Sequence, residues 1–385
     1  MRVLFLQQGL GYGGASQSLI QMQRALTGKV EMYTVLKKNR RLNKKLMHLL
    51  CHSKVVVEMD IPGVYSYPEG ISTLEELNRA QHFNPTELLS FIQKNKIDIL
   101  HVNASVFSNL YHWLKRESNV KIVTHIREAI PESKDTVTSF IVNQINAYSD
   151  WIIPIANEEA VHFSNSDKCT ILINPVDTHF FSRVPRVENS TIVIGMMANF
   201  NPLKGHKLFI EVVRELNKKY AGNKKVRFEL LGIPASGFLN FKCWLPLKRF
   251  AYFQEVMREI KRSNFTNLTL IPFQENVKDV IARWDIALRM ERSMKPWGRD
   301  VLETMSMGIP MVALGNSEVV IKNNVTGKLV NSLQSAEVIE ALIPLIDDDK
   351  SRKDMGVEGR IWMQENAGID RYSERILGIY KNIMR

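Results

Sequence analysis

The sequence contains few cysteines and no long apolar run. Only three cysteines occur in 385 residues, too few and too far apart to form a metal-binding motif or a disulfide framework: Cys51, Cys169 and Cys243. No stretch of about eighteen apolar residues occurs, so no transmembrane helix is expected. Near the N-terminus the run "VLFL" is short and glycines follow it, which predicts a strand and a turn instead of a signal peptide. We therefore expect a protein of the reducing cytoplasm.

Motifs for nucleic acid recognition are also lacking. The sequence has neither zinc-finger spacing nor the aromatic motif of RNA-recognition domains, so nucleic acid is not an expected partner. The formal net charge is nevertheless +11. Such a basic surface also suits a phosphorylated substrate or an anionic membrane.

Short apolar segments alternate with helical patterns in two successive blocks. The first block contains "RVLFLQ", "DILHVN" and "WIIPIA", and the second contains "TIVIGMM", "VRFELLG" and "PMVAL". Residues 174–190 between them are rich in Pro, Asp and Ser and lack periodicity, as linkers do. The pattern predicts an α/β protein with two doubly wound domains, residues 1–180 and 190–365, and a ligand cleft between them.

Two stretches depart from this alternation, and each has two interpretations. Residues 36–54 carry seven Lys or Arg residues and no acid, with leucines on one helical face. They form either a solvated helix packed on its domain or a helix that contacts an anionic membrane. Residues 234–263 contain six aromatic residues interleaved with basic ones. They form either a lid packed on the second domain or a contact for a lipid or an acceptor.

Two turns between a predicted strand and a predicted helix are candidates for binding phosphate. The first, "GLGYGGAS" at 9–16, is glycine-rich, which lets backbone approach a ligand beside the free N–H groups of a helix start. The second, "PLKG" at 202–205, adds the charge of Lys204 to a helix dipole. The lysine charge and the helix dipole together suit a diphosphate held without a metal ion. The alternatives are a plain tight turn and a surface lysine.

The segment "PWGRDVLETMSMGIPMVAL" predicts a helix that begins after Gly298. Arg299 and Asp300 fall in its first turn, and Glu303 falls one turn further on the same side as Arg299. A carboxylate near the N-terminal end of such a helix can accept both hydroxyls of a ribose. The alternative for Glu303 is a surface charge, although the apolar sequence that follows favours burial.

Polar residues end two predicted strands of the first domain. His101 closes "DILHVN", and His125 closes "KIVTHIRE", where Arg127 and Glu128 follow. Because the carboxyl ends of strands face the ligand crevice in open α/β sheets, these side chains are candidates for binding or catalysis. A structural role for the histidines is the alternative.

Taken together, these segments resemble the retaining glycosyltransferases of the GT-B fold, family four, also called glycosyl transferases group 1. The resemblance covers most of the chain in order. Its most specific part is "PWGRDVLETMSMGIPMVA", which is similar to the family's acidic motif and the "EAMACGxPVV"-type sequence that follows it. "INPVDTHFF" is similar to the family's "IPNGVDTxxF". The resemblance implies two Rossmann-like domains that face a cleft, with residues 366–385 as a helix returning to the N-terminal domain.

The resemblance also implies roles for individual residues. The C-terminal domain binds a nucleotide diphosphate sugar, the diphosphate at Lys204 and the ribose at Glu303, while the acceptor rests on the N-terminal domain. The implied catalytic residues are His125, Lys204 and Arg299. The implied donor-binding positions are Gly13, Gly14, Asn199, Lys204, Lys295, Gly298, Arg299, Asp300 and Glu303. The acceptor side contains His101, Arg127 and Glu128.

Two of these positions depart from the family pattern. The family's first acid stands eight residues before Glu303, where this sequence has Lys295. Glu291 lies about one turn before Lys295. It can take the place of the family's acid only if the loop here differs from that of the family. The family's arginine five or six residues before Lys204 is replaced by Asn199 or Ala198.

The predicted function is transfer of a sugar, with retention, from a nucleotide diphosphate donor to a glycan or lipid-linked acceptor in bacterial surface polysaccharide synthesis. Neither a metal nor a cofactor is expected, and the location is the cytoplasm, with the inner face of the plasma membrane left open. Lys295 favours a second hypothesis, a catalytically inactive sugar-nucleotide or glycan-binding partner of another transferase. A sugar-nucleotide epimerase ranks lower because its acidic residues are arranged differently.

Overall fold

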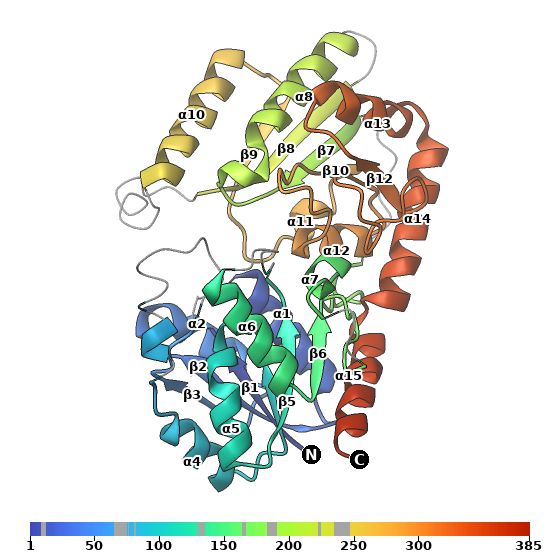
Figure 1. The fold of residues 1–385 in the computed structure, drawn as a ribbon. Coiled ribbons are helices and arrows are strands. Elements are labelled where there is room, and N and C mark those ends of the chain that lie inside the picture. Colours follow the sequence, from blue (N-terminus) through green and yellow to red (C-terminus); the bar gives the residue numbers. More distant parts are fainter. Residues whose placement is uncertain are drawn as a thin grey trace. The chain divides into compact units, whose positions relative to one another are not determined.

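The computed structural model describes two compact units. One unit combines Met1–Pro175 with Gly368–Arg385, and the other is Val176–Ala367 (Figure 1). Each contains one parallel sheet with helices on both faces, so the predicted α/β class with two Rossmann-like domains is confirmed. The described residues are 1–8, 13–64, 75, 77–80, 82–128, 130, 135–163, 167–182, 191–221, 225–234 and 247–385.

The sheet of the first unit has six strands in the order β3-β2-β1-β4-β5-β6, all parallel. The chain order reverses between β1 and β4, and α/β sheets bind ligands at the carboxyl end of such a switch point. The strands are β1 (Arg2–Gln7), β2 (Glu31–Lys37), β3 (Val55–Met59), β4 (Ile99–Val102), β5 (Lys121–Ile126) and β6 (Trp151–Pro154).

Apolar cores cover both faces of this sheet because successive side chains of a strand point to opposite sides. In β1, Leu4 and Leu6 pack into one core, and Val3 and Phe5 pack into the other. The helical elements of the unit are α1 (Gly14–Leu26), α2 (Arg40–Leu49), α4 (Thr86–Lys94), η1 (Ser105–Leu110), α5 (Tyr111–Glu117), α6 (Thr136–Tyr148), α7 (Asn157–Ala160) and α15 (Ile369–Ile383).

The sheet of the second unit repeats this topology with the order β12-β11-β10-β7-β8-β9. Its strands are β7 (Thr191–Met197), β8 (Lys225–Ile233), β9 (Leu268–Pro272), β10 (Ile286–Arg289), β11 (Met311–Leu314) and β12 (Gly327–Val330). The helical elements are η2 (Pro202–Lys204), α8 (His206–Lys219), α10 (Leu247–Ser263), α11 (Lys278–Ile281), α12 (Arg299–Ser306), α13 (Ser335–Asp347) and α14 (Asp349–Asn366).

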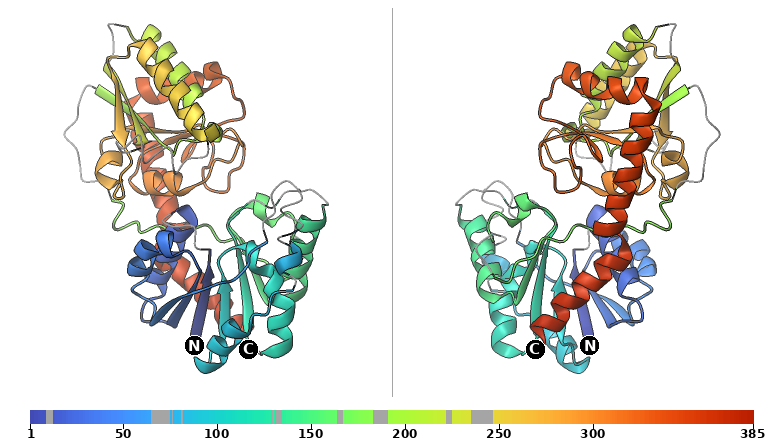
Figure 2. Two further views of the ribbon diagram at one scale, coloured as in Figure 1. Left: turned by 90° about the vertical axis from the view of Figure 1, so that its left-hand side faces the viewer. Right: turned by 90° about the vertical axis from the view of Figure 1, so that its right-hand side faces the viewer.

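The last helix belongs to the first unit, as the resemblance implies. Helix α15 packs against α1, and its residues Tyr372, Ile376 and Tyr380 are buried in the core beneath β1 (Figure 2). Their spacing of four residues places all three on one helical face. The amphipathic pattern of "RYSERILGIYKNIMR" is therefore accounted for by this contact.

The units divide at residues 175/176 and 367/368, where the sequence suggested 180, 190 and 365. Residues 176–182 belong with the second unit because α14 holds them. The amide of Val176 donates to the carbonyl of Ala367 at 2.9 Å, and Arg360 Nη1 donates to the carbonyl of Phe181 at 3.2 Å. Residues 183–190 of the predicted linker lie outside the described residues.

The basic stretch 36–54 contains α2, whose apolar side packs on its own unit. Leu46 and Leu50 are fully buried, and Asn43 donates to the carbonyl of Lys37 at 2.9 Å. The solvated-helix interpretation therefore accounts for these leucines, and contact with a membrane stays a prediction. In the parts of the chain that the structure describes, no helix combines the length and the apolar character that crossing a membrane requires.

Part of the aromatic stretch 234–263 forms helix α10, which packs on the second unit. Tyr252 and Phe253 are buried there, and the ring of Phe253 stands edge-on to Phe200 with 4.9 Å between centroids. Residues 235–246, with the other aromatic residues Phe238, Phe241 and Trp244, lie outside the described residues. Phe250 lies in α10.

Candidate functional site

The "PLKG" turn follows β7 and is closed by its own polar groups. The side chain of Asn201 accepts from the amide of Leu203 at 3.0 Å, and the backbone carbonyl of Asn201 accepts from the amide of Lys204 at 2.9 Å. Gly205 then adopts a left-handed conformation with φ of 70°. A Cβ atom at this position would lie 2.1 Å from the carbonyl oxygen of Met290, so the close approach of two backbone segments also requires glycine.

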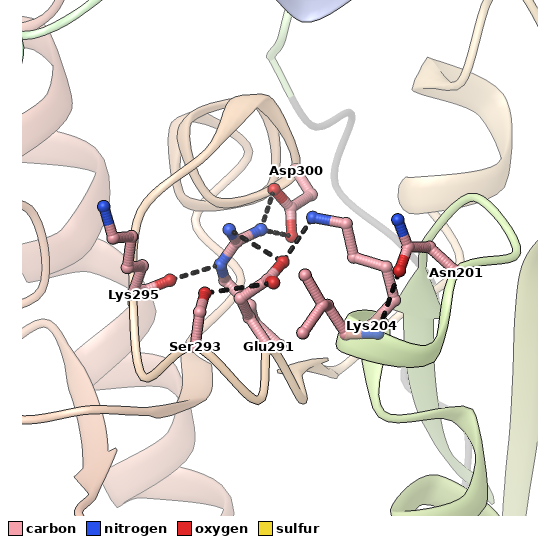
Figure 3. Close-up of polar contacts among 8 residues, drawn as sticks. Asn201, Lys204, Glu291, Ser293, Lys295 and Asp300 are labelled. Carbon is pink, nitrogen blue, oxygen red and sulfur yellow. Dashed lines mark hydrogen bonds and ion pairs between the residues drawn. The ribbon is translucent and has the colours of Figure 1, made fainter. Parts of the chain in front are cut away.

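The loop after β10 packs on this turn and supplies an acid to Lys204. The amide of Arg292 donates to the carbonyl of Leu203 at 2.7 Å. The ammonium group of Lys204 pairs with Glu291, whose side chain points toward it in Figure 3. Glu291 is only 6% exposed, and its second oxygen accepts from Ser293 Oγ at 3.1 Å. Lys204 thus meets a buried carboxylate in this structure.

Arg289, the last residue of β10, completes a cluster of two cations and two acids. Its Nη1 donates to both carboxylate oxygens of Asp300, at 2.6 and 2.7 Å, and its Nε donates to the carbonyl of Lys295 at 2.8 Å. Its Nη2 lies 3.6 Å from Glu291. Gly298 leaves room for this pair, because a Cβ there would lie 2.5 Å from Asp300 Oδ1.

Helix α12 begins directly after Gly298 and brings Arg299 and Glu303 together, as their spacing predicts. Arg299 donates to Glu303 Oε1 from Nε at 3.0 Å and from Nη2 at 2.8 Å. Burial raises the pKa of Glu303 above its usual range, and the charge of Arg299 opposes this shift. Glu303 is therefore a buried acid and not a surface charge. The charge of Arg299, expected at a diphosphate, is directed at Glu303 here.

The structure describes both positions that depart from the family pattern, Lys295 and Asn199. The side chain of Lys295 points away from Lys204 in Figure 3, and its Nζ lies over the ring of Trp297 at 5.5 Å from the centroid. Its backbone carbonyl, and not its charge, contacts Arg289. Asn199 is exposed two residues after the end of β7.

In the first unit, the adjacent strands β4 and β5 bring the two histidines together. His101 Nε2 and His125 Nδ1 lie 3.2 Å apart, and Arg127 Nη2 lies 3.2 Å from the same His125 nitrogen. Both imidazoles are fully buried, and burial, followed by the charge of Arg127, lowers the pKa of both well below the usual range. The pair is therefore neutral. A fourth group, the hydroxyl of Tyr380, lies 2.7 Å from His101 Nδ1.

The other charged residues of this edge have partners in their own unit. Arg127 Nε donates to Asn103 Oδ1 at 2.7 Å. Glu128 accepts from the amide and the hydroxyl of Ser105 and so holds the start of η1. Burial raises the pKa of the Glu128 carboxyl, and these hydrogen bonds oppose the shift. These contacts give Glu128 a role in the structure of the loop, while its expected role toward an acceptor stays a prediction.

The glycine turn of the first unit is described from Gly13 onward. Gly13 precedes α1 in an extended conformation, and its carbonyl accepts from the amide of Gln17 at 2.9 Å. A Cβ added at Gly13 would meet no described atom within 4 Å. Residues 9–12 of the predicted turn lie outside the described residues.

Sequence reasoning missed Arg289 and Tyr380. Arg289 ends the buried strand "IALR", so the argument that selected the histidines, a polar residue at the carboxyl end of a strand, applies to it as well. Tyr380 had no such signal. It lies 279 positions after His101, and only the docking of α15 brings the two together.

Part of the chain is similar to a known protein family. Residues 177–362 match the model described as Glycosyl transferases group 1. No curated protein sequence matched the chain.

Several solved structures share the fold of the whole chain. HepE of Anabaena in complex with UDP is 16% identical with a TM-score of 0.78, and the alignment covers 99% of this chain and 100% of that one. A glycosyltransferase from Rickettsia africae is 16% identical with a TM-score of 0.75 and coverages of 100% and 98%. A TarM variant of S. aureus in complex with UDP is 12% identical with a TM-score of 0.71 and coverages of 100% and 100%. With two Rossmann-like units and these structural matches, the chain has the GT-B fold, and its residues 177–362 are similar to the glycosyl transferases group 1 family.

Proposed function

We propose that this protein is a glycosyltransferase that moves a sugar from a nucleotide diphosphate donor to a glycan or lipid-linked acceptor, with retention and without a metal ion. Structures of HepE contain UDP or UDP-glucose, and the TarM structure contains UDP together with α-GlcNAc-glycerol. A uridine diphosphate sugar is therefore the first donor to test. An intermediate of bacterial surface polysaccharide synthesis is the acceptor class that we expect.

The observation that carries the proposal is the cluster of Lys204 and Arg289 at the carboxyl ends of the paired strands β7 and β10. Two cations beside the start of α12 suit a diphosphate, because charge-assisted hydrogen bonds and the helix dipole both favour an anion there. Glu291 and Asp300 neutralise these cations within the unit. A donor diphosphate would replace Glu291 as the partner of Lys204.

The chemistry follows from this arrangement. As the bond between the anomeric carbon and the diphosphate oxygen breaks, negative charge grows on the diphosphate, and Lys204 and Arg289 stabilise it, with Arg299 as a further cation. The acceptor hydroxyl attacks the anomeric carbon from the same face and gives its proton to the departing diphosphate oxygen. The buried Glu303 accepts the ribose hydroxyls, and His125 contacts the transferred sugar. No step uses a carboxylate as a covalent nucleophile.

A panel of sugar nucleotides tests the donor. We expect one uridine diphosphate sugar to raise the melting temperature in the presence of a chelator, because a ligand that binds only the folded protein stabilises it. With that donor and a bacterial membrane extract, the labelled sugar should enter a glycan or lipid product, and the anomeric configuration of the product should equal that of the donor. Inversion would contradict the retaining mechanism, and a requirement for a divalent cation would contradict metal independence.

One observation favours a second function, a binding partner of another transferase without activity of its own. Lys295 stands where the family has an acid, and the side chain points away from Lys204. Such a protein would bind a sugar nucleotide tightly and transfer nothing with any extract. Turnover of a bound donor decides between the two functions.

Contact of α2 with an anionic membrane remains a separate proposal about location. The helix presents Lys44 to solvent, with Lys45 beside it, while Leu46 is buried. Flotation with phosphatidylglycerol vesicles should retain the parent protein and release the variant Lys44→Gln/Lys45→Gln. Equal binding of both proteins would exclude α2 as the membrane contact.

A further inference from the structure

A chain of buried polar groups connects the C-terminal helix to His125. The Tyr380 hydroxyl on α15 lies 2.7 Å from His101 Nδ1, and His101 Nε2 lies 3.2 Å from His125 Nδ1. All three side chains are fully buried. The rings also contact one another, with centroids 5.9 Å apart for Tyr380 and His101 and 5.4 Å apart for the two histidines.

The donors and acceptors of this chain can be assigned in one direction. A guanidinium group only donates, so Arg127 Nη2 requires His125 Nδ1 to be an acceptor. His101 Nε2 faces the same acceptor and must therefore carry a proton. A neutral His101 then has an unprotonated Nδ1, which accepts from the hydroxyl of Tyr380. The proton of a neutral His125 is consequently on Nε2.

Burial keeps every member of the chain in this protonation state. It is the first cause that lowers the pKa of both histidines well below the usual range. It also raises the pKa of Tyr380 well above the usual range, so the hydroxyl keeps the proton that it donates. Among the described residues, the charge of Arg127 acts on both histidines and on Tyr380. Tyr372 acts on Tyr380, and burial raises the pKa of Tyr372 to about 12.

We propose that Tyr380 is a positioning residue for His125, because through His101 it fixes the His125 ring with its proton on Nε2. The proposal rests on the proposed function, in which His125 contacts the transferred sugar. His125 Nε2 is buried and has no hydrogen-bond partner among the described residues. This N–H is then a donor for an oxygen of the sugar, and His125 offers no lone pair to act as a base at that atom.

Loss of the Tyr380 hydroxyl removes the donor that selects the His101 tautomer. His101 Nδ1 would become a buried acceptor without a partner, and such an atom favours taking up the proton itself. In that tautomer the lone pair of His101 Nε2 would face the lone pair of His125 Nδ1, and the two would repel. The His125 ring would lose its fixed orientation, and the Nε2–H would no longer be held toward the substrate.

Nitrogen NMR of ring-labelled histidine tests the assignment directly in the full-length protein. We expect His101 and His125 to give signals of neutral rings protonated at Nε2 at pH 7, with assignments from His101→Gln and His125→Gln. A proton on Nδ1 of either ring, or a charged imidazolium, would overturn the proposal. This measurement needs no substrate and no tyrosine variant, so it decides the matter even if a variant fails to fold.

Two tyrosine variants separate positioning from stability. Tyr111 is a matched control, because it is also fully buried and its hydroxyl accepts from Thr124, the neighbour of His125 in β5, at 2.8 Å. Tyr380→Phe should lower kcat/KM for the donor about tenfold, the scale of one hydrogen bond, and change the ring spectrum. Tyr111→Phe should lower stability alone. Equal activity and spectra for the two variants would refute a positioning role.

A double variant tests whether Tyr380 acts through His101. Tyr380→Phe combined with His101→Gln should be no less active than His101→Gln alone, because the route to His125 is already broken. If the double variant instead loses activity by the product of the two single-variant losses, the proposal is contradicted. If no sugar nucleotide is turned over, the proposed function is contradicted. The NMR measurement of the histidine tautomers then still tests whether Tyr380 and His101 position His125.

Discussion

Lys204, in the turn after β7, is bound by Glu291, which lies 87 positions later in the chain. The lysine is partly exposed, whereas Glu291 is almost entirely buried. The acid therefore occupies the place where the proposed diphosphate would meet the ammonium group. Donor binding has to exchange one anionic partner of Lys204 for another, and this exchange can be measured.

Replacement of Glu291 should strengthen the binding of UDP. In Glu291→Gln the side-chain amide still interacts with Ser293. The negative charge that competes with the diphosphate for Lys204 and Arg289 is removed. We expect UDP to bind about three- to tenfold more tightly by calorimetry, because one charge-assisted contact no longer has to be broken. Glu255→Gln is the control, since Glu255 pairs with Lys207 at 2.6 Å on the surface. Unchanged or weaker binding in Glu291→Gln would show that Glu291 does not compete with the diphosphate.

Replacement of Arg289 should destabilise the second unit. The guanidinium is 10% exposed and holds Asp300 and the carbonyl of Lys295. Arg289→Ala leaves the Asp300 carboxylate without this partner, which should lower the free energy of unfolding by about 3 kcal/mol. Arg289→Lys restores the charge but not the paired geometry, so we expect an intermediate value. Urea titration measures both, and a loss below about 1 kcal/mol for the alanine variant would contradict the assigned contacts.

Glycine at position 205 should be required for the "PLKG" turn. Gly205→Ala places a methyl group against the carbonyl of Met290 in a left-handed conformation. We expect a loss of about 3 kcal/mol in the free energy of unfolding. Gly378→Ala in α15 is the matched control, because an added methyl group meets nothing within 4 Å there. That control should gain about 0.5–1 kcal/mol from helix propensity. Similar stabilities in denaturant for the two variants would contradict the close approach.

The stability of the protein should fall in acid, partly through His206. Burial lowers the pKa of His206 to about 4, and the charge of Lys204 is a second cause. In the unfolded chain this histidine takes up a proton near its usual pKa of about 6.5. The unfolded state therefore binds more protons below pH ~6.5. As the pH falls between the unfolded and folded pKa values of His206, this group lowers the free energy of unfolding by up to about 1.4 kcal/mol per pH unit.

The variant His206→Phe tests this pH dependence. The imidazole stacks on Phe200 with 4.3 Å between centroids, so a phenyl ring can take its place. Urea titrations at pH 7 and pH 5 should show a smaller loss of stability in the variant than in the parent protein. His48→Phe, at an exposed position of α2, controls for the substitution itself. An equal loss in His206→Phe and in the parent would contradict the assignment.

Local patterns in the sequence were sufficient to predict the strand and helix order and part of the candidate site. The run from Gly298 to Glu303 predicted the start of α12 and placed Glu303 on the same side as Arg299, because residues four apart meet on a helix; that the two side chains pair was not predicted. The partners of Lys204 and His101 could not be found in this way. Glu291 and Tyr380 reach them across 87 and 279 positions, and such contacts depend on how β10 and α15 pack. A periodic pattern records which face of an element is buried, but it does not record what that face contacts.

The most direct measurement of the central claim is sugar transfer by Lys204→Ala beside Lys207→Ala. Both variants remove one lysine from neighbouring positions, but Lys207 pairs with Glu255 on the surface and has no contact with the cluster of Glu291 and Arg289 among the described residues. With the donor found in the panel, Lys204→Ala should lose at least about 100-fold in kcat/KM, because the charge that stabilises the leaving diphosphate is gone. Its melting temperature should stay within a few degrees, because Arg289 and Ser293 still hold Glu291. Lys207→Ala should transfer at the rate of the parent protein. Near-normal transfer by Lys204→Ala would contradict the account.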